Sequence, residues 1–138
     1  MQYDELIGEV QHRAQLDSRE AALSTTRATL ETLSERIQPG EAENLAGQLP
    51  EELGRHLENV DDVERFDLET FVERVAERES LGGDDYEDVA YRSRVVMEVL
   101  DEAVTGSVMT ELKSQLPDEY DDLFALQETE ATAGPDSE

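Results

Sequence analysis

Two nearly identical phrases recur along this chain. Residues 48–53 read Gln-Leu-Pro-Glu-Glu-Leu and residues 115–120 read Gln-Leu-Pro-Asp-Glu-Tyr, so corresponding positions differ by 67. Proline suits the first turn of a helix and pushes the residue before it away from helical geometry. The acids that follow complement the positive end of the helix dipole. Each phrase therefore predicts a sharp turn between two helices, in which Gln48 or Gln115 caps the preceding helix or bonds across the corner.

The apolar residues predict helices along almost the whole chain. They recur at intervals of three and four, which places them on one stripe of each amphipathic helix. In the first half the stripes contain Tyr3, Leu6, Ile7, Val10 and Ala14, then Leu23, Thr26, Leu30, Leu33 and Ile37, then Ala42, Leu45, Ala46 and Leu49, and finally Leu53 and Leu57. The second half repeats this order, at an offset of 65 before Gly82-Gly83 and of 67 after it. We find no strand pattern.

These patterns predict an all-α fold. We expect a single domain over residues 1–125, built from two pseudo-repeated four-helix halves, with about eight helices in total. The first repeat covers about 1–62 and the second about 66–125. Residues 126–138 have no periodicity and are interpreted as a mobile acidic tail.

The surface of this domain is expected to be strongly acidic. The 138 residues include 36 acids against 11 bases, which gives a formal net charge of -25, and Lys113 is the one lysine. Such a surface repels nucleic acids and anionic membrane faces. Concentrated salt screens the self-repulsion of so many acids. The composition is therefore typical of a halophilic protein from a salt-accumulating archaeal cytoplasm.

Several other classes of protein are excluded by composition. The chain has no cysteine, which excludes disulfides and thiolate chemistry. Its first residues have no basic and apolar run typical of a signal peptide, and no apolar run approaches the ~18 residues of a membrane span. We therefore expect a cytoplasmic protein that does not contact the membrane.

Three motifs resemble a known family. They are Tyr3-Asp4-Glu5-Leu6, Ala28-Thr29-Leu30-Glu31-Thr32-Leu33, and the two Gln-Leu-Pro phrases with their acids. With them the chain resembles a prokaryotic family known as domain of unknown function 2267, from residue 1 to about 125. The resemblance implies an all-helical, duplicated domain. It implies no activity, cofactor or site residue.

Candidate catalytic and metal-binding motifs are weak. Glu9 and His12 have the Glu-x-x-His spacing of di-iron carboxylate bundles, but the second half has Arg74 and Glu77 at the aligned positions. His56 is interpreted as a half-exposed helical residue. The acidic loop near Asp84 lacks the ordered spacing of a calcium loop and is interpreted as a helix start. We therefore predict no enzyme activity, no cofactor and no specific metal site.

Two arginines are candidates for an anion site. Arg27 and Arg94 occupy matching positions in the two halves, and each has a glutamate four residues later, Glu31 and Glu98. The favoured interpretation is a structural role, in which each arginine ties a long helix to an acid on a neighbouring helix. The alternative is a pseudo-symmetric anion pocket that uses the bidentate fork of arginine.

The two halves differ most in their long helices. In the first half Thr25, Thr29, Thr32 and Arg36 form the face away from the core stripe. In the second half Val95, Val96 and Val99 make the helix apolar nearly all round. Such a helix is buried on more than one side. We favour a central position in the domain, and the alternative is that these valines form an interface with a partner or a second copy.

The expected role is a non-enzymatic protein-interaction or regulatory module of a salt-rich cytoplasm. One alternative is a small-anion or divalent-metal binding protein that uses Arg27 and Arg94 or the loop near Asp84. A weaker alternative is a nucleic-acid mimic that binds a basic partner. The partner is expected to be an unidentified protein or a second copy of the chain.

Overall fold

The computed structural model is all-helical over the residues it describes, which are 1–58, 62–79, 81, 85–105 and 107–124. The elements are α1 (Tyr3–Ala14), α2 (Arg19–Arg36), α3 (Pro39–Gly47), α4 (Glu51–Gly54), the 3-10 helix η1 (Arg55–Leu57), α5 (Leu68–Arg78), α6 (Tyr86–Ala103), α7 (Val108–Ser114) and the 3-10 helix η2 (Asp118–Phe124). No strand occurs within those ranges, so the predicted all-α class is confirmed. The predicted tail lies outside the described residues.

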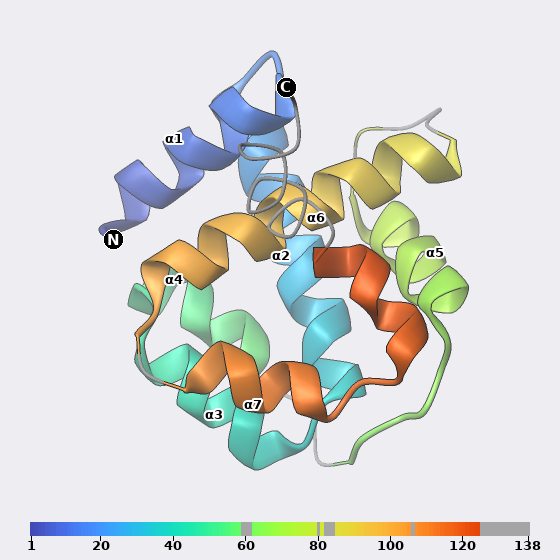
Figure 1. Ribbon diagram of the computed structural model, residues 1–138. Helices are drawn as coiled ribbons and strands as arrows, with labels where there is room; N and C mark the ends of the chain where they lie inside the picture. The colour runs from blue at the N-terminus through green and yellow to red at the C-terminus, as the bar shows by residue number, and fades with distance from the viewer. Residues whose placement is uncertain (59–61, 80, 82–84, 106, 125–138) are drawn as a thin grey trace, which may run out of the picture.

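Two long helices, α2 and α6, cross at the centre of the molecule (Figure 1). α1 packs on both of them, and so does α5. η1 packs on α2 and η2 packs on α6, while α3 and α7 lie side by side. Helices from each half of the chain therefore contact the central helix of the other half. The second half follows the order of the first as far as α7, and the 3-10 helix η2 then stands in place of α4 and η1. The duplication itself stays a prediction.

Side-chain caps explain where three helices begin. Ser18 Oγ accepts a hydrogen bond from the backbone N of Ala21 at the start of α2. Asp67 caps α5 and Asp85 caps α6 in the same way, each through its carboxylate. These side chains satisfy N–H groups that have no partner inside the helix.

An aromatic corner closes the core between α5 and η2. The rings of Phe71 and Tyr120 meet edge to face, with centroids 5.9 Å apart. The buried hydroxyl of Tyr120 donates to the carbonyl oxygen of Phe66 at 2.7 Å, which satisfies the one polar group of that side chain. The corner fixes η2 against α5 and α6.

The two Gln-Leu-Pro phrases are helix starts. Pro50 is the N-cap of α4, and Pro117 directly precedes η2. Gln48 and Gln115 are the C-cap residues of α3 and α7, as one of the two alternatives predicted, and their side chains bond to the other half of the chain. Gln48 Oε1 accepts from the backbone N of Thr105 at 2.7 Å, and Gln115 Oε1 accepts from the backbone N of Gln38 at 2.9 Å. The two bonds are reciprocal at the offset of 67, and each joins the corner of one half to the connection that follows α6 or α2 in the other.

The polar face of α2 is buried, which corrects the interpretation that it lies away from the core. Thr25, Thr29 and Thr32 are each 0% exposed and Arg36 is 4% exposed. The hydroxyls of Thr29 and Thr32 donate to the carbonyl oxygens four residues earlier, at 2.8 and 2.9 Å. Because these hydroxyls find partners on their own helix, the face can be buried without unsatisfied polar atoms. Both α2 and α6 are therefore central.

Candidate functional site

The valine face of α6 lies inside the chain. Val95, Val96 and Val99 are 1%, 0% and 0% exposed. α6 is surrounded by α1, α2, α5 and η2. In this structure the three valines therefore have no surface that a partner could cover, and the central position is the one observed.

Arg94 lies beside a small apolar hollow between α5, α6 and η2. The hollow, of about 60 Å³, is lined by Leu68, Val72, Tyr86, Ala90, Arg94, Asp122 and Leu123. Arg94 Nε donates to the backbone carbonyl oxygen of Asp122 at 2.8 Å, which ties α6 to η2. This contact supports a structural role for Arg94, with part of its side chain still accessible at the rim of the hollow.

Tyr86 is the exposed aromatic residue at this hollow. Tyr86 is the first residue of α6, and it is 43% exposed. Partial burial, and then the negative charge of Glu69, raise the pKa of its hydroxyl, while the charge of Arg94 lowers it. The Tyr86 hydroxyl is therefore neutral at physiological pH and lies among both signs of charge. We call the residues lining this hollow the Tyr86 surface.

Arg27 lies elsewhere and does not line the Tyr86 surface. It is half-buried on α2, and within the described residues its side chain makes no hydrogen bond or ion pair. Glu31, four residues later, contacts His56 of η1 instead, with 3.1 Å between Oε2 and Nδ1. Glu98 accepts from Arg13. The structure thus does not bring Arg27 and Arg94 together around the hollow, and the anion site stays a prediction.

The motifs considered for metal binding have other contacts. Glu9 accepts a hydrogen bond from Arg13 Nε at 2.9 Å, and His12 is exposed on α1. In the part of the chain that the structure describes, no group of three or more His, Cys, Asp or Glu side chains could hold a metal ion. Residues 82–84 of the acidic loop lie outside the described residues, but Asp85 is the N-cap of α6, which confirms that the motif is a helix start.

A larger groove of about 500 Å³ opens between α3 and η1. Its lining consists of Pro39, Glu43, Ala46, Gly47, Leu57 and Glu58. Leu57 is buried at the bottom, whereas Glu43 and Glu58 are exposed. Gly54 lets α4 approach α3, because a Cβ there would lie 2.9 Å from the carbonyl oxygen of Ala46. We call this concavity the α3 groove; it was not apparent from sequence spacing.

Ion pairs tie the outer helices to the central helices of the opposite half. Arg13 of α1 binds Glu98 and Glu102 of α6, and the matching Arg78 of α5 binds Glu35 of α2. Burial opposes ionisation of Glu35, but hydrogen bonds from Arg78 and Arg74 outweigh it, so the pKa of Glu35 lies below its ordinary value. The hydrogen bond from Arg13 likewise lowers the pKa of Glu102.

A buried ion pair lies where α5 ends, and sequence reasoning missed it. Arg92 donates to both carboxylate oxygens of Glu79, at 3.0 and 2.7 Å, and the Thr25 hydroxyl donates to the same carboxylate. The exposed fractions of Glu79 and Arg92 are 6% and 8%. In so acidic a chain no spacing signal distinguishes Glu79 from the many solvated acids.

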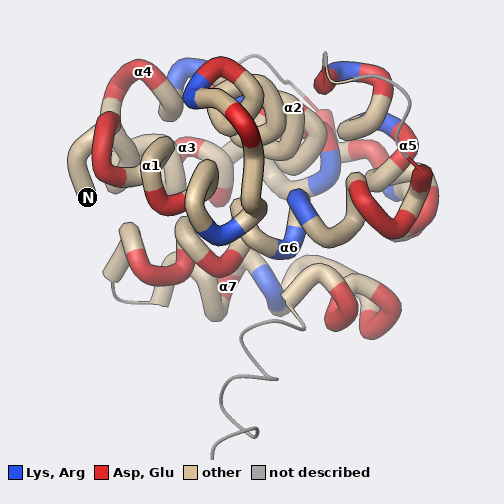
Figure 2. Tube along the Cα trace, turned by 90° about the horizontal axis from the view of Figure 1, so that it is seen from above, with Lys and Arg blue, Asp and Glu red and all other residues tan. Residues whose placement is uncertain are grey.

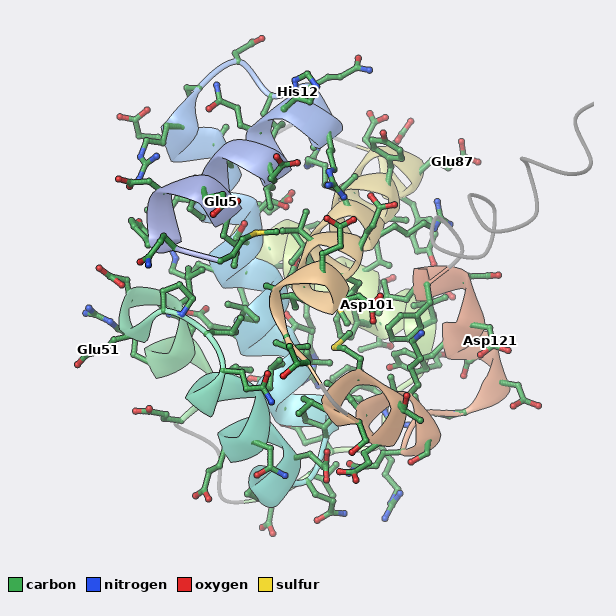
Figure 3. All side chains as sticks on the ribbon, turned by 60° about the vertical axis from the view of Figure 1, so that its left-hand side comes forward. Glu5, His12, Glu51, Glu87, Asp101 and Asp121 are labelled. Atoms are coloured by element: carbon green, nitrogen blue, oxygen red, sulfur yellow. The ribbon has the colours of Figure 1, made fainter. Side chains whose placement is uncertain are left out.

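The remaining acids form a coat over the domain. Asp and Glu positions lie on helices all round the molecule, and they outnumber Lys and Arg (Figure 2). Glu51, Glu87 and Asp121 project outward from three different elements (Figure 3).

The fold and these surfaces define a small all-α domain with an acidic coat and two concave surface features. Within this class, the chain belongs to a family described as uncharacterized conserved protein (DUF2267), whose sequence model matches residues 3–123. That family carries no assigned biochemical activity. No curated protein matches the chain. Among the helices that the structure describes, none has the length and apolar character needed to cross a membrane.

Proposed function

We propose that this protein is a non-enzymatic interaction module that binds another protein through the Tyr86 surface. The observation that carries the proposal is an exposed tyrosine beside an apolar hollow and a partly accessible arginine. Tyrosine and arginine are enriched among the residues that dominate the energy of protein interfaces, where they fill or flank small pockets. The hollow has room for a methyl or isopropyl group of a partner.

Tyr91 supplies the contrast that makes Tyr86 informative. Tyr91 lies on the same helix and is 38% exposed, close to the 43% of Tyr86. However, its hydroxyl donates to the backbone carbonyl oxygen of Arg13 at 3.0 Å, so the ring is held against α1. Tyr86 has a neighbouring hollow and Tyr91 has a structural contact.

Site-specific photocrosslinking tests the proposal. A benzophenone amino acid is placed at Tyr86, or at Tyr91 as the matched control, and the protein is irradiated in the cells of its source organism. We expect one discrete crosslinked protein for position 86 and none for position 91. A smear at both positions, or the same product from both, would contradict a binding role for the Tyr86 surface.

The proposed setting is a salt-rich cytoplasm. The acidic coat repels itself over a Debye length of about 10 Å at ~0.1 M salt and only about 3 Å at ~1 M. We therefore expect the melting temperature to rise steeply with KCl between dilute and molar concentrations. A melting temperature that stays flat from ~0.1 to ~2 M KCl would contradict the halophilic proposal.

Arg27 favours a second candidate function, the binding of a small anion. A half-buried guanidinium without a hydrogen bond or ion pair in the described residues is unusual in a chain with 36 acids. Titration with inorganic phosphate, followed by NMR, tests this. We expect shifts around Arg27 that disappear in Arg27→Met and persist in Arg55→Met, which removes an exposed arginine of η1. Equal shifts in both variants would show non-specific attraction only.

A further inference from the structure

Two residues that line the α3 groove have counterparts in the second half that contact each other. At the offset of 67, Ala46 and Leu57 of the groove correspond to Lys113 of α7 and Phe124 of η2. The ammonium nitrogen of Lys113 lies 4.8 Å from the centre of the Phe124 ring. In the second half a lysine side chain therefore reaches over the apolar residue of the 3-10 helix, whereas in the first half the short side chain of Ala46 lies beside an open groove.

The lining of the open groove suits the same kind of side chain. Pro39 and Ala46 are partly exposed and give an apolar surface for the methylene stem of a lysine. Glu43 comes from α3 and Glu58 follows η1, so the groove has an exposed carboxylate from each of its two walls. An ammonium group held between the two carboxylates would gain charge-assisted hydrogen bonds.

We propose that the α3 groove binds a lysine side chain presented by a different protein. Lys113 is the one lysine of the chain and contacts Phe124, so a second copy has no other lysine to offer. The acidic coat would attract a basic partner from a distance and the groove would select its lysine at contact. The inference shares the proposed role in protein binding but uses a separate surface, so this test and crosslinking at Tyr86 can fail independently.

The probe is Nα-acetyl-lysine methylamide, titrated into the isotope-labelled full chain and followed by NMR. Nα-acetyl-norleucine methylamide has a similar apolar stem without the charge. We expect saturable shifts of the Gly47 amide and the Leu57 methyl groups with the lysine probe and weak, unsaturated shifts with norleucine. Glu43→Gln and Glu58→Gln should each weaken binding about two- to fivefold, the range of a partly exposed ion pair. Glu52→Gln removes the same charge from α4 outside the groove and should leave binding unchanged.

A plug variant makes the test independent of overall charge. Ala46→Lys introduces at the matching position the side chain that lies over Phe124 in the second half. We expect it to remove binding of the lysine probe while the protein keeps its urea stability. Unchanged binding in Ala46→Lys, an equal effect of Glu52→Gln, or tighter binding of spermidine than of the lysine probe would each overturn the proposal.

Discussion

The two central helices are buried by different chemistry. At matching positions α2 has Thr29 and Thr32 where α6 has Val96 and Val99, and all four side chains are 0% exposed. The threonines occupy a volume similar to that of valine and bond their hydroxyls to their own helix. The comparison teaches that a central helix needs satisfied polar groups, and that it need not be apolar on every side.

One matching pair of residues is polar on both central helices. Thr25 of α2 and Arg92 of α6 are related by the same offset, and both donate to the carboxylate of Glu79. Here the two central helices meet through a shared acid at the end of α5. An ion pair therefore holds α2 and α6 together at Glu79, whereas packing holds the neighbouring turns of these two helices.

The largest effect is expected from Val96→Asp. Because the site is buried between helices, the substitution leaves an unpaired charge in the core and should cost more than about 4 kcal/mol, enough to unfold the domain. Circular dichroism in ~2 M KCl measures this. Thr29→Val is the matched change on α2 and should alter the unfolding free energy by about 1 kcal/mol or less. A folded Val96→Asp protein would contradict the central position of α6.

The contribution of charge to the contact between α2 and α6 can be measured at the buried ion pair of Glu79 and Arg92. Arg92→Met leaves the Glu79 carboxylate buried with the Thr25 hydroxyl and should lower the unfolding free energy in urea by about 3–5 kcal/mol. The double variant Glu79→Met/Arg92→Met removes both charges and should recover much of that loss. If the double variant is as unstable as the single one, packing and not charge holds this junction.

The reciprocal glutamines should behave alike. Gln48→Ala and Gln115→Ala each remove a hydrogen bond between the halves, worth about 0.5–1.5 kcal/mol. Gln2→Ala is the control, since the Gln2 side chain makes no cap hydrogen bond. Urea unfolding compares the three variants. A clearly larger loss for one of the two corner glutamines would show that the two corners are not equivalent.

The smallest effect concerns acid stability. The pKa values of Glu35 and Glu102 are lowered, so their ion pairs stabilise the fold fully above the ordinary glutamate pKa of about 4.3 and are lost as pH falls through the lower folded values. Glu35→Gln should remove about 0.5–1 kcal/mol of this acid-dependent loss, and Glu102→Gln less, because its side chain is 44% exposed against 20%. Urea unfolding at pH 3 to 6 in ~2 M KCl, which screens the acidic coat, measures both. If the unfolding free energy of the unchanged protein, Glu35→Gln and Glu102→Gln depends on pH in the same way, these two ion pairs do not contribute to acid stability.

Much of the fold could be predicted from spacing. Apolar stripes gave the helices, Pro50 and Pro117 marked two corners, and the apolar run around Val96 indicated a central helix. These features are local, because periodicity and turn chemistry depend on neighbours within a few residues. The burial of Thr29 and Thr32 was missed because a polar residue is usually exposed, and nothing in the sequence says that its hydroxyl will bond to its own helix.

The contacts between halves could not be predicted in the same way. Gln48 is visible as a turn residue, but its partner Thr105 lies far along the chain and carries no matching signal. Glu79 is one acid among many. The α3 groove is lined by residues of both α3 and η1, and no spacing signal shows that these two elements leave an open space between them. Long-range geometry decides these sites, whereas residue type alone does not.

The exchange of outer helices between the two halves bears on how the chain folds during synthesis. α1 needs α6 as well as α2, and α2 needs α5 and α6 to cover its sides. When only the first half has left the ribosome, α2 would still expose Thr25 and Arg36 and would lack the Glu79 carboxylate. We expect the nascent first half to stay loosely packed until α6 emerges, so that the domain folds in one late, cooperative step. Native-state hydrogen exchange should then show α2 and α6 opening together, although they come from opposite halves of the chain.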